Sequence, residues 1–252
     1  MSYLGVHRLM TDKHPNLDKQ SHEIRLMFAG IAHRYDLLNR ILSGWVDTHW
    51  RRLTVRLAPP TIQGPVLDVC TGTGDLVLGY QRKYHDRLTI GTDFCREMLH
   101  FAHKKALAGS GPKPLFLEAD TMVLPMRDNH FALTTVAFGL RNTQDPRQAL
   151  KEMCRVTRPG GRLAVLEFSM PTWPVLGAVY SWYFQKVLPK VGQTISRSPA
   201  TAYGYLPQSV KKFPQGEDLC SWIRGAGWES VTHRPFTMGI ATLYTANKPS
   251  VG

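Results

Sequence analysis

One stretch of the chain, Pro65–Leu76 (PVLDVCTGTGDL), constrains the fold more than any other. It begins as a short apolar strand, carries Asp68 near the end of that strand, turns through Gly72 and Gly74, and then opens a helix. Glycine permits such a tight turn and lets a ligand approach the backbone closely. Open α/β sheets bind ligands in the crevice at the carboxyl ends of their strands. The stretch therefore predicts a turn that holds a nucleotide-like cofactor.

The residues around this turn narrow the choice of cofactor. A P-loop needs a lysine followed by Ser or Thr after its last glycine, whereas Asp75 and Leu76 follow here. The dinucleotide fingerprint needs a third glycine three residues after the second, and this position is Val77. Asp68 and Asp75 flank the turn and suit a cationic cofactor without phosphates, such as S-adenosylmethionine (SAM). An ordinary turn between a strand and a helix is the alternative.

Two further acids follow the next predicted strands. Asp93 comes directly after the strand 88–92, where doubly wound folds place an acid on the ribose hydroxyls. Asp120 follows the strand 115–118, and an acid there can accept a hydrogen bond from an adenine amino group. Capping of the next helix is the alternative role for Asp93. Because two such acids share one edge of the sheet, we favour cofactor binding.

A third polar group follows the strand 131–138, in the sequence Phe138–Asn142 (FGLRN). The carboxyl end of this strand faces the reactive end of a cofactor bound at the preceding turns. An Arg and an Asn side by side in such a loop favour a functional role over a packing role. We therefore predict that Arg141 and Asn142 take part in the reaction.

The composition excludes several classes of protein. The chain has 252 residues, of which 43% are hydrophobic and 20% charged, which fits one α/β domain with appendages. The four cysteines contain no Cys-x-x-Cys pair, so neither a metal site nor a disulfide framework is expected. This use of cysteine is typical of a protein in a reducing compartment. The net charge of +12 predicts attraction to nucleic acid, anionic lipid or acidic proteins without choosing among them.

The location of the protein is also predicted from what the chain lacks. Its first residues have no apolar core of a signal peptide. No uncharged apolar run approaches the roughly 18 residues that span a bilayer. A cytoplasmic protein, with peripheral membrane contact at most, is expected.

The rest of the chain predicts helices and strands in alternation. A loose tail and two helices, 21–42 and 45–57, form an N-terminal extension over 1–58. The later helices are expected at 75–84, 95–108, 146–156 and 217–226. The strands are expected at the start of the stretch 65–76 and at 88–92, 115–118, 131–138, 162–168, 228–235 and 240–247, the last two as an antiparallel hairpin. This order predicts, over 59–252, a Rossmann-like α/β fold with a seven-stranded, mostly parallel sheet and helices on both faces.

A long segment, 169–216, interrupts this alternation. It contains no Asp or Glu, is rich in aromatic residues such as Trp173 and Tyr180, and carries its basic residues at the edges. Such a segment could stack bases and hold phosphates, lie on an anionic membrane and shape an apolar pocket, or be buried in the core of the protein. Because the basic residues are not interleaved with the aromatic ones, we favour a hydrophobic ligand over RNA.

Three stretches resemble the ubiquinone/menaquinone C-methyltransferase family (UbiE type) among the class I SAM-dependent methyltransferases. They are Tyr35–Asn39 continuing through Ser43 to Trp50, Phe138–Asn142, and Arg155–Arg162 continuing to Ser169. The Pro-Gly-Gly turn in the third stretch is common to many methyltransferases, whereas the first two stretches are narrower signals. The resemblance covers nearly the whole chain after residue 20. It implies methyl transfer from SAM to a ring carbon of a prenylated quinol, either a demethylmenaquinol or a ubiquinone precursor.

The resemblance also assigns residues to the cofactor. It places Thr73, Asp93, Asp120 and Thr121 in contact with SAM, with Gly72 and Gly74 forming the turn. The chain departs from the family pattern at three positions: the first glycine of the loop is Cys70, a serine that contacts SAM in many relatives is Ala137, and a histidine is Asp47, with His49 two places later.

The implied substrate sets the chemistry. A ring carbon beside a hydroxyl becomes nucleophilic when that hydroxyl loses its proton, so the protein must align carbon, methyl and sulfur and stabilise the phenolate. We assign Arg141 to the phenolate, because an arginine is a poor proton acceptor near neutrality. Asn142 and Tyr35 are expected to orient the quinol. Three residues are candidate bases that spacing does not rank: His33, His49 and Asp36.

The expected partners follow from the same resemblance. The prenylated quinol is reached by peripheral contact with an anionic membrane, and the segment 169–216 receives the prenyl tail. A homo-oligomer is left open. No nucleic acid is expected, since no Asn-Pro-Pro-Tyr-like motif or catalytic cysteine pair for base methylation occurs. Two alternatives remain: a SAM methyltransferase for another small aromatic or lipid-like acceptor, and an RNA-binding methyltransferase.

Overall fold

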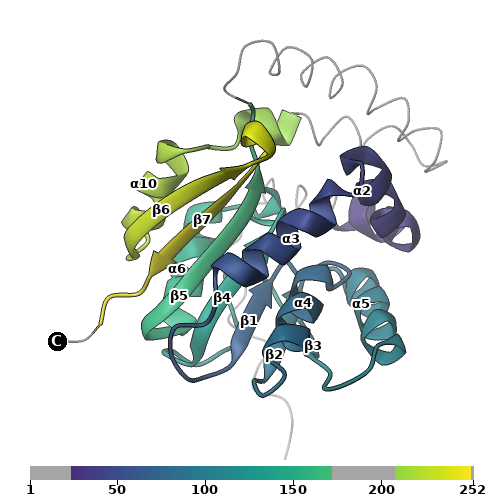
Figure 1. Ribbon diagram of the computed structural model, residues 1–252, viewed down its shortest axis with the longest axis horizontal. Helices are drawn as coiled ribbons and strands as arrows, with labels where there is room; N and C mark the ends of the chain where they lie inside the picture. Colours follow the sequence, from purple (N-terminus) through teal and green to yellow (C-terminus); the bar gives the residue numbers. More distant parts are fainter. Residues whose placement is uncertain (1–23, 172–207, 251–252) are drawn as a thin grey trace, which may run out of the picture.

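The computed structural model describes residues 24–171 and 208–250. Its centre is a seven-stranded sheet with the strand order β3-β2-β1-β4-β5-β7-β6 (Figure 1). The strands are β1 Val66–Val69, β2 Thr89–Asp93, β3 Leu115–Glu118, β4 Phe131–Ala137, β5 Thr157–Phe168, β6 Glu229–Phe236 and β7 Ala241–Asn247. The first five strands run parallel, and β7 pairs antiparallel with both β5 and β6. The predicted Rossmann-like sheet and its closing hairpin are confirmed.

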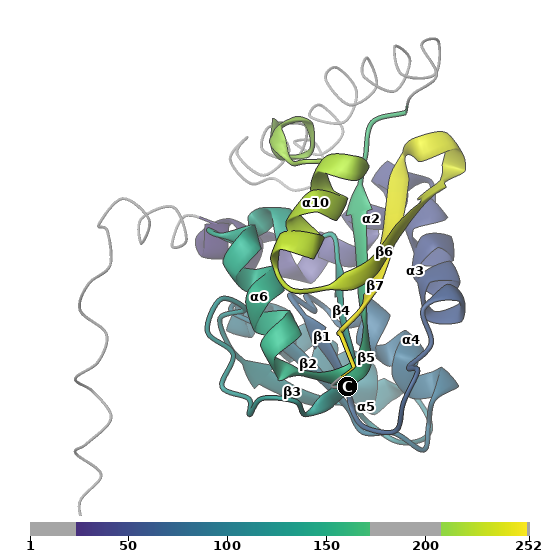
Figure 2. The same ribbon diagram turned by 90° about the vertical axis from the view of Figure 1, so that its left-hand side faces the viewer.

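Helices cover both faces of this sheet (Figures 1 and 2). One face carries α3 (Val46–Leu57), α4 (Asp75–Lys83) and α5 (Arg96–Ala108), and the other carries α6 (Pro146–Val156) and α10 (Glu217–Gly225). Because successive strand residues point to opposite faces, β1 sends Leu67 into the core under α6 and α10 and Val66 into the core under α3 and α4. The central strands are therefore apolar on both sides, as parallel strands covered by helices must be.

The N-terminal extension differs from the prediction in one respect, because its first helix is interrupted. Residues 24–31 are helical, the 3-10 turn η1 (Ala32–Arg34) follows, and α2 (Tyr35–Ser43) then begins. The rings of Phe28 and Tyr35, from either side of this turn, lie edge to face with their centroids 6.0 Å apart.

The start of α3 explains the departure at Asp47. This carboxylate is buried, accepts a hydrogen bond from Ser43 Oγ (2.8 Å), and forms an ion pair with Arg51 (2.6 Å). The ion pair helps to hold the Arg51 guanidinium 5.0 Å from the centroid of the Phe138 ring. Asp47 therefore has a structural role between α2, α3 and the loop after β4.

The strand β5 begins at Thr157, five residues before the predicted start at Arg162. Thr157 pairs with Phe131 and Arg162 pairs with Leu133, so residues 158–161 bulge out of the ladder. A Cβ on Gly161 would lie 2.7 Å from the Thr157 side chain, which makes glycine necessary there. The Pro-Gly-Gly sequence thus forms a bulge inside the strand instead of a turn before it.

Most of the segment 169–216 lies outside the described residues, including its aromatic middle and the predicted site for a prenyl tail. Near its end, residues 208–212 are helical, and Val210 and Phe213 are buried. In the part of the chain that the structure describes, no helix is both long enough and apolar enough to cross a bilayer.

Candidate active site

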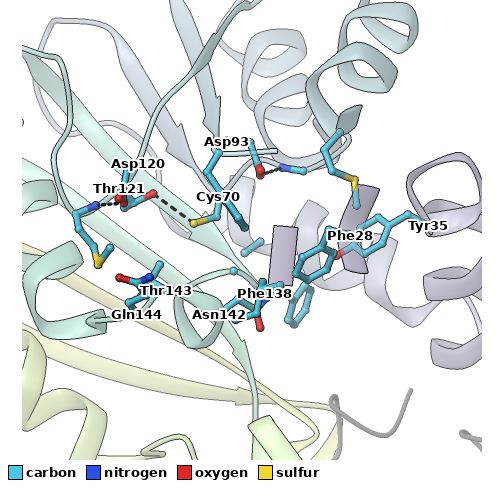
Figure 3. A pocket seen from close by; sticks show the side chains of 17 residues that line it. Phe28, Tyr35, Cys70, Asp93, Asp120, Thr121, Phe138, Asn142, Thr143 and Gln144 are labelled. Carbon is cyan, nitrogen blue, oxygen red and sulfur yellow. Dashed lines mark hydrogen bonds between the residues drawn. The ribbon is translucent and has the colours of Figure 1, made fainter. Parts of the chain in front are cut away.

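A pocket opens at the carboxyl ends of β1, β2, β3 and β4, beside the N-terminal helices (Figure 3). The predicted site residues that line it are Tyr35, Gly72, Asp93, Asp120, Thr121 and Asn142. Four other predicted residues do not line it: Asp68, Thr73, Gly74 and Arg141. The sheet therefore brings residues from four separate loops and from α2 to one cavity.

The charge of this pocket is opposite to that of the whole chain. Among the described residues that line it, the ionisable carboxylates are Asp93 and Asp120, and none is Lys or Arg. The chain as a whole carries a net charge of +12. Two carboxylates without a cation favour a positively charged ligand and disfavour one that carries phosphates.

Asp93 connects the glycine turn to the end of β2. Its Oδ2 accepts a hydrogen bond from the backbone N–H of Gly72 (2.8 Å), and its Oδ1 accepts one from that of Cys95 (2.9 Å). Burial raises the pKa of Asp93 to about 6, although both backbone N–H groups stabilise the charged form. The backbone fixes this carboxylate in position, and the side chain still lines the pocket.

Asp120 and Thr121 lie on the loop after β3. Asp120 Oδ1 accepts a hydrogen bond from the backbone N–H of Met122 (2.9 Å), which holds the loop in place. Thr121 Oγ1 lies 3.4 Å from Cys70 Sγ, which joins this loop to the one after β1. Asp120 itself is exposed, so its second carboxylate oxygen is accessible to a ligand.

The loops after β1 and β4 approach each other at Cys70 and Gly139. A Cβ on Gly139 would lie 2.4 Å from Cys70 Cβ, so only glycine fits there. Cys70 has a φ of +49°, a left-handed conformation that suits the glycine expected from the family pattern. Burial raises the pKa of the Cys70 thiol, which keeps it protonated near neutrality.

Asp68 lies beneath the turn. Its two oxygens accept hydrogen bonds from the hydroxyls of Thr71 and Thr135, each at 2.6 Å. The side chain is 1% exposed, and burial raises its pKa to about 6. The structure therefore places Asp68 beneath the turn, outside the lining of the pocket but beside a smaller adjoining hollow that Thr73 and Arg51 also line.

The raised pKa of Asp68 predicts how stability depends on pH. Between about pH 4 and pH 6 the folded state binds a proton that the unfolded state has lost, so stability decreases as pH rises through this window. Asp68→Asn removes the ionisable group and keeps one acceptor and one donor for the two threonines. Relative to the wild type, it should gain up to roughly 3 kcal/mol between pH 4 and pH 7. Urea unfolding at several pH values measures this difference, and parallel curves for the two proteins would contradict it.

Thr73 and Gly74 hold the surrounding helices together. Thr73 Oγ1 donates a hydrogen bond to Asp36 (2.5 Å), and Lys105 lies within 2.6 Å of carboxylate oxygens of both Asp36 and Asp75. A Cβ on Gly74 would lie 3.1 Å from Ala102 Cβ, so this glycine lets α4 and α5 pack closely. The network fixes α2, which carries Tyr35, against the turn after β1.

Arg141 is buried behind the pocket in an ion pair with Glu167. A terminal nitrogen of its guanidinium donates to Glu167 (2.8 Å) and to the carbonyl oxygen of Phe138. The Arg141 and Glu167 side chains are 6% and 1% exposed. Arg141 Nε and Asn142 Oδ1 are buried and have no hydrogen-bond partner among the described residues. An unpaired donor and an unpaired acceptor thus lie on adjacent residues.

Tyr35 lines the pocket, whereas the three candidate bases do not. Burial raises the pKa of Tyr35, so its hydroxyl stays protonated and can donate a hydrogen bond. His33 and His49 are exposed. Asp36 is occupied by Thr73 and Lys105. The geometry brings Tyr35 and Asn142 together at the pocket and leaves the base unassigned.

Several pocket residues were not predicted. Phe28 and Met98 supply apolar wall, and Gln144 supplies a polar side chain. Glu167 is the largest omission, because it binds Arg141. The sequence does show Glu167 as a lone acid in the apolar strand β5. A carboxylate buried in such a strand needs a buried cation as its partner.

Comparisons with known proteins give relatives of similar sequence. The model of the ubiE/COQ5 methyltransferase family matches residues 16–248. A demethylmenaquinone methyltransferase from Thermus thermophilus is 45% identical over 88% of this chain and 100% of its own length. One from Deinococcus radiodurans is 44% identical, over 92% and 95%. A ubiquinone/menaquinone biosynthesis C-methyltransferase UbiE from Geotalea daltonii is 40% identical, over 92% and 99%.

Solved structures are similar in fold at low identity. The [4+2]-cyclase SpnF aligns with a TM-score of 0.65 and 17% identity, over 92% of this chain and 97% of its own. A SAM-dependent methyltransferase from Thermotoga maritima aligns with a TM-score of 0.64 and 18% identity, over 89% and 99%. At these identities the likeness concerns the fold alone.

Proposed function

This chain belongs to the ubiE/COQ5 methyltransferase family, and we propose that it transfers the methyl group of SAM to a ring carbon of demethylmenaquinol. The acceptor is the one named by the relatives that are 44% and 45% identical over most of both chains. One observation carries the cofactor assignment: the pocket at the strand ends has two carboxylates and no lining cation among the described residues. That charge suits the sulfonium and ammonium of SAM and opposes a phosphate-bearing cofactor.

Each part of the cofactor has a matching group in this proposal. Asp93 accepts hydrogen bonds from the ribose hydroxyls, as acids at this strand end do in doubly wound folds. Asp120 accepts one from the adenine amino group, and Thr121 lies beside it. Gly72 brings its backbone close to the ligand without a side chain in between. Asp68, Thr73 and Gly74 are outside the lining of this pocket and support the turn through their hydrogen bonds and packing.

The acceptor ring lies against Tyr35 and Asn142 in this proposal. The unpaired Oδ1 of Asn142 accepts a hydrogen bond from the remaining hydroxyl of the quinol, and the unpaired Nε–H of Arg141 stabilises the phenolate oxygen. Glu167 keeps the Arg141 guanidinium in place. Bound SAM supplies a methyl group that its sulfonium has already activated, so the residues have to align the ring carbon with it and exclude water.

We also propose where the enzyme is located in the cell. A prenylated quinol resides in a membrane, so we expect a cytoplasmic protein that meets an anionic membrane at its surface. A homo-oligomer is compatible with this arrangement and is not required by it.

The quinones of a cell that lacks the protein test the proposed function. We expect demethylmenaquinone to accumulate and menaquinone to disappear, and we expect the wild-type chain to restore the profile. Mass spectrometry of extracted quinones measures both. An unchanged ratio of the two quinones in the deficient cell would contradict the proposal.

A further inference from the structure

A second hollow in the molecule has the opposite charge to the active-site pocket. It lies between α2, α3, α4 and the end of α5, and we call it the basic groove. Seven Lys and Arg side chains and one carboxylate, that of Asp75, line it, for a formal charge of +6. The basic side chains are Arg40, Arg51, Arg52, Arg82, Lys83, Lys105 and Lys113. Methyl transfer at the pocket uses none of this charge directly.

The positive charge of the basic groove is only partly compensated. Arg51 pairs with Asp47, and Lys105 pairs with Asp36 and Asp75. Arg40, Arg52 and Arg82 have no ion-pair partner in the described part of the chain. Guanidinium groups gathered in one hollow repel each other, and an anion that they share removes this repulsion.

The remaining lining restricts the kind of anion. No aromatic side chain lies among the described residues of the groove, so it offers no platform for stacking nucleic-acid bases. Its apolar residues, such as Val55, Leu78 and Ala106, are small or aliphatic and sit among charged ones. Arginine forks match the geometry of phosphate oxygens and bind them with two parallel hydrogen bonds.

We propose that the basic groove binds a phosphate-bearing anion. Phosphate chemistry has two sources here, a free polyphosphate and the headgroup of an anionic phospholipid. The groove is next to the active site, because Arg51 lines it and lies over Phe138, which lines the active-site pocket. A headgroup bound there would hold this side of the protein at a membrane surface, and a free phosphate would occupy the groove in solution. The proposal does not depend on methyl transfer.

Binding to the purified full-length chain tests this proposal with two probes. Inorganic pyrophosphate is titrated by calorimetry, and vesicles of phosphatidylcholine with and without phosphatidylglycerol are co-sedimented with the protein. The groove variant is Arg40→Gln/Arg52→Gln/Arg82→Gln. The control variant, Arg56→Gln/Lys151→Gln/Arg234→Gln, removes the same charge from exposed positions outside the groove.

We expect the wild type to bind at least one probe. The groove variant should bind this probe at least about tenfold more weakly, because it lacks charge-assisted hydrogen bonds to the anion. The control variant should stay close to the wild type. Binding of pyrophosphate alone identifies a free anion, and binding of phosphatidylglycerol vesicles alone identifies a headgroup.

Three results would overturn the proposal: no binding of either probe, unchanged binding in the groove variant, or equal weakening in the control variant. Circular dichroism checks the fold of both variants. Their affinity for SAM, measured separately, shows that a failure at the groove is not a failure at the active site.

Discussion

Replacing Arg141 by methionine should lower the free energy of unfolding by about 3–5 kcal/mol, the usual cost of removing one partner from a buried ion pair. The Glu167 side chain is 1% exposed and, among the described residues, would keep only the backbone N–H groups of Arg141 and Phe168 as partners. Methionine fills much of the volume of arginine, so the loss comes from the uncompensated carboxylate and less from a cavity. Urea-induced unfolding near neutral pH measures the change.

A second substitution separates the charge from the packing. In Arg141→Met/Glu167→Gln the carboxylate is gone, and we expect more than half of the lost stability to return. A loss of less than about 1 kcal/mol for Arg141→Met is typical of exposed pairs and would contradict the buried pair. Absence of recovery in the double variant would contradict it as well.

The variant Arg141→Lys then tests the chemistry in a folded protein. Lysine keeps a cation for Glu167 but lacks the Nε–H group that is unpaired in Arg141. Turnover should fall far more than SAM affinity. If both fall equally, Arg141 does not act on the acceptor.

Replacing Asp93 by alanine should weaken SAM binding by about 10- to 100-fold. A hydrogen bond to a charged group contributes about 1.5–3 kcal/mol, and about 1.4 kcal/mol corresponds to a factor of ten in affinity. The substitution also leaves the backbone N–H groups of Gly72 and Cys95 without an acceptor, so the turn itself loses support. Isothermal titration with SAM measures the affinity.

Asp93→Asn is the matched control. The amide retains one oxygen for a backbone N–H group and has nearly the same volume, so its effect on SAM binding should lie between those of the wild type and alanine. Thermal unfolding of both variants shows how much of the effect comes from the turn. Unchanged SAM affinity in folded Asp93→Ala would remove Asp93 from the cofactor site.

Much of the fold was predictable because it rests on local pattern. The strand and turn at Val66–Gly74 follow from a short apolar run and from Gly72 and Gly74, whose positive φ angles favour glycine. The hairpin of β6 and β7 follows from two apolar runs close together in the sequence. The lining role of Asp93 and Asp120 was predictable for the same reason, since parallel strands bring their carboxyl ends to one edge.

The features that could not be predicted from the sequence depend on contacts between distant segments. Arg141 and Glu167 meet because β4 and β5 are neighbours in the sheet, and no local pattern reports that pairing. The 3-10 turn at Ala32–Arg34 interrupts a stretch in which the apolar spacing stays helical throughout, so this spacing alone does not locate the turn. Residues 158–161 interrupt the pairing of β5 with β4, and the Pro-Gly-Gly sequence alone does not show that the strand continues on both sides of it.

Transfer of a labelled methyl group tests the central claim most directly. The purified chain is incubated with SAM that carries a trideuterated methyl group and with demethylmenaquinol, and the quinones are analysed by mass spectrometry. We predict that wild-type protein places the label on a ring carbon and that Asp93→Ala does so much more slowly at the same SAM concentration. SAM binding without any labelled menaquinone would contradict the proposed acceptor, and equal rates for the two proteins would contradict the proposed cofactor site.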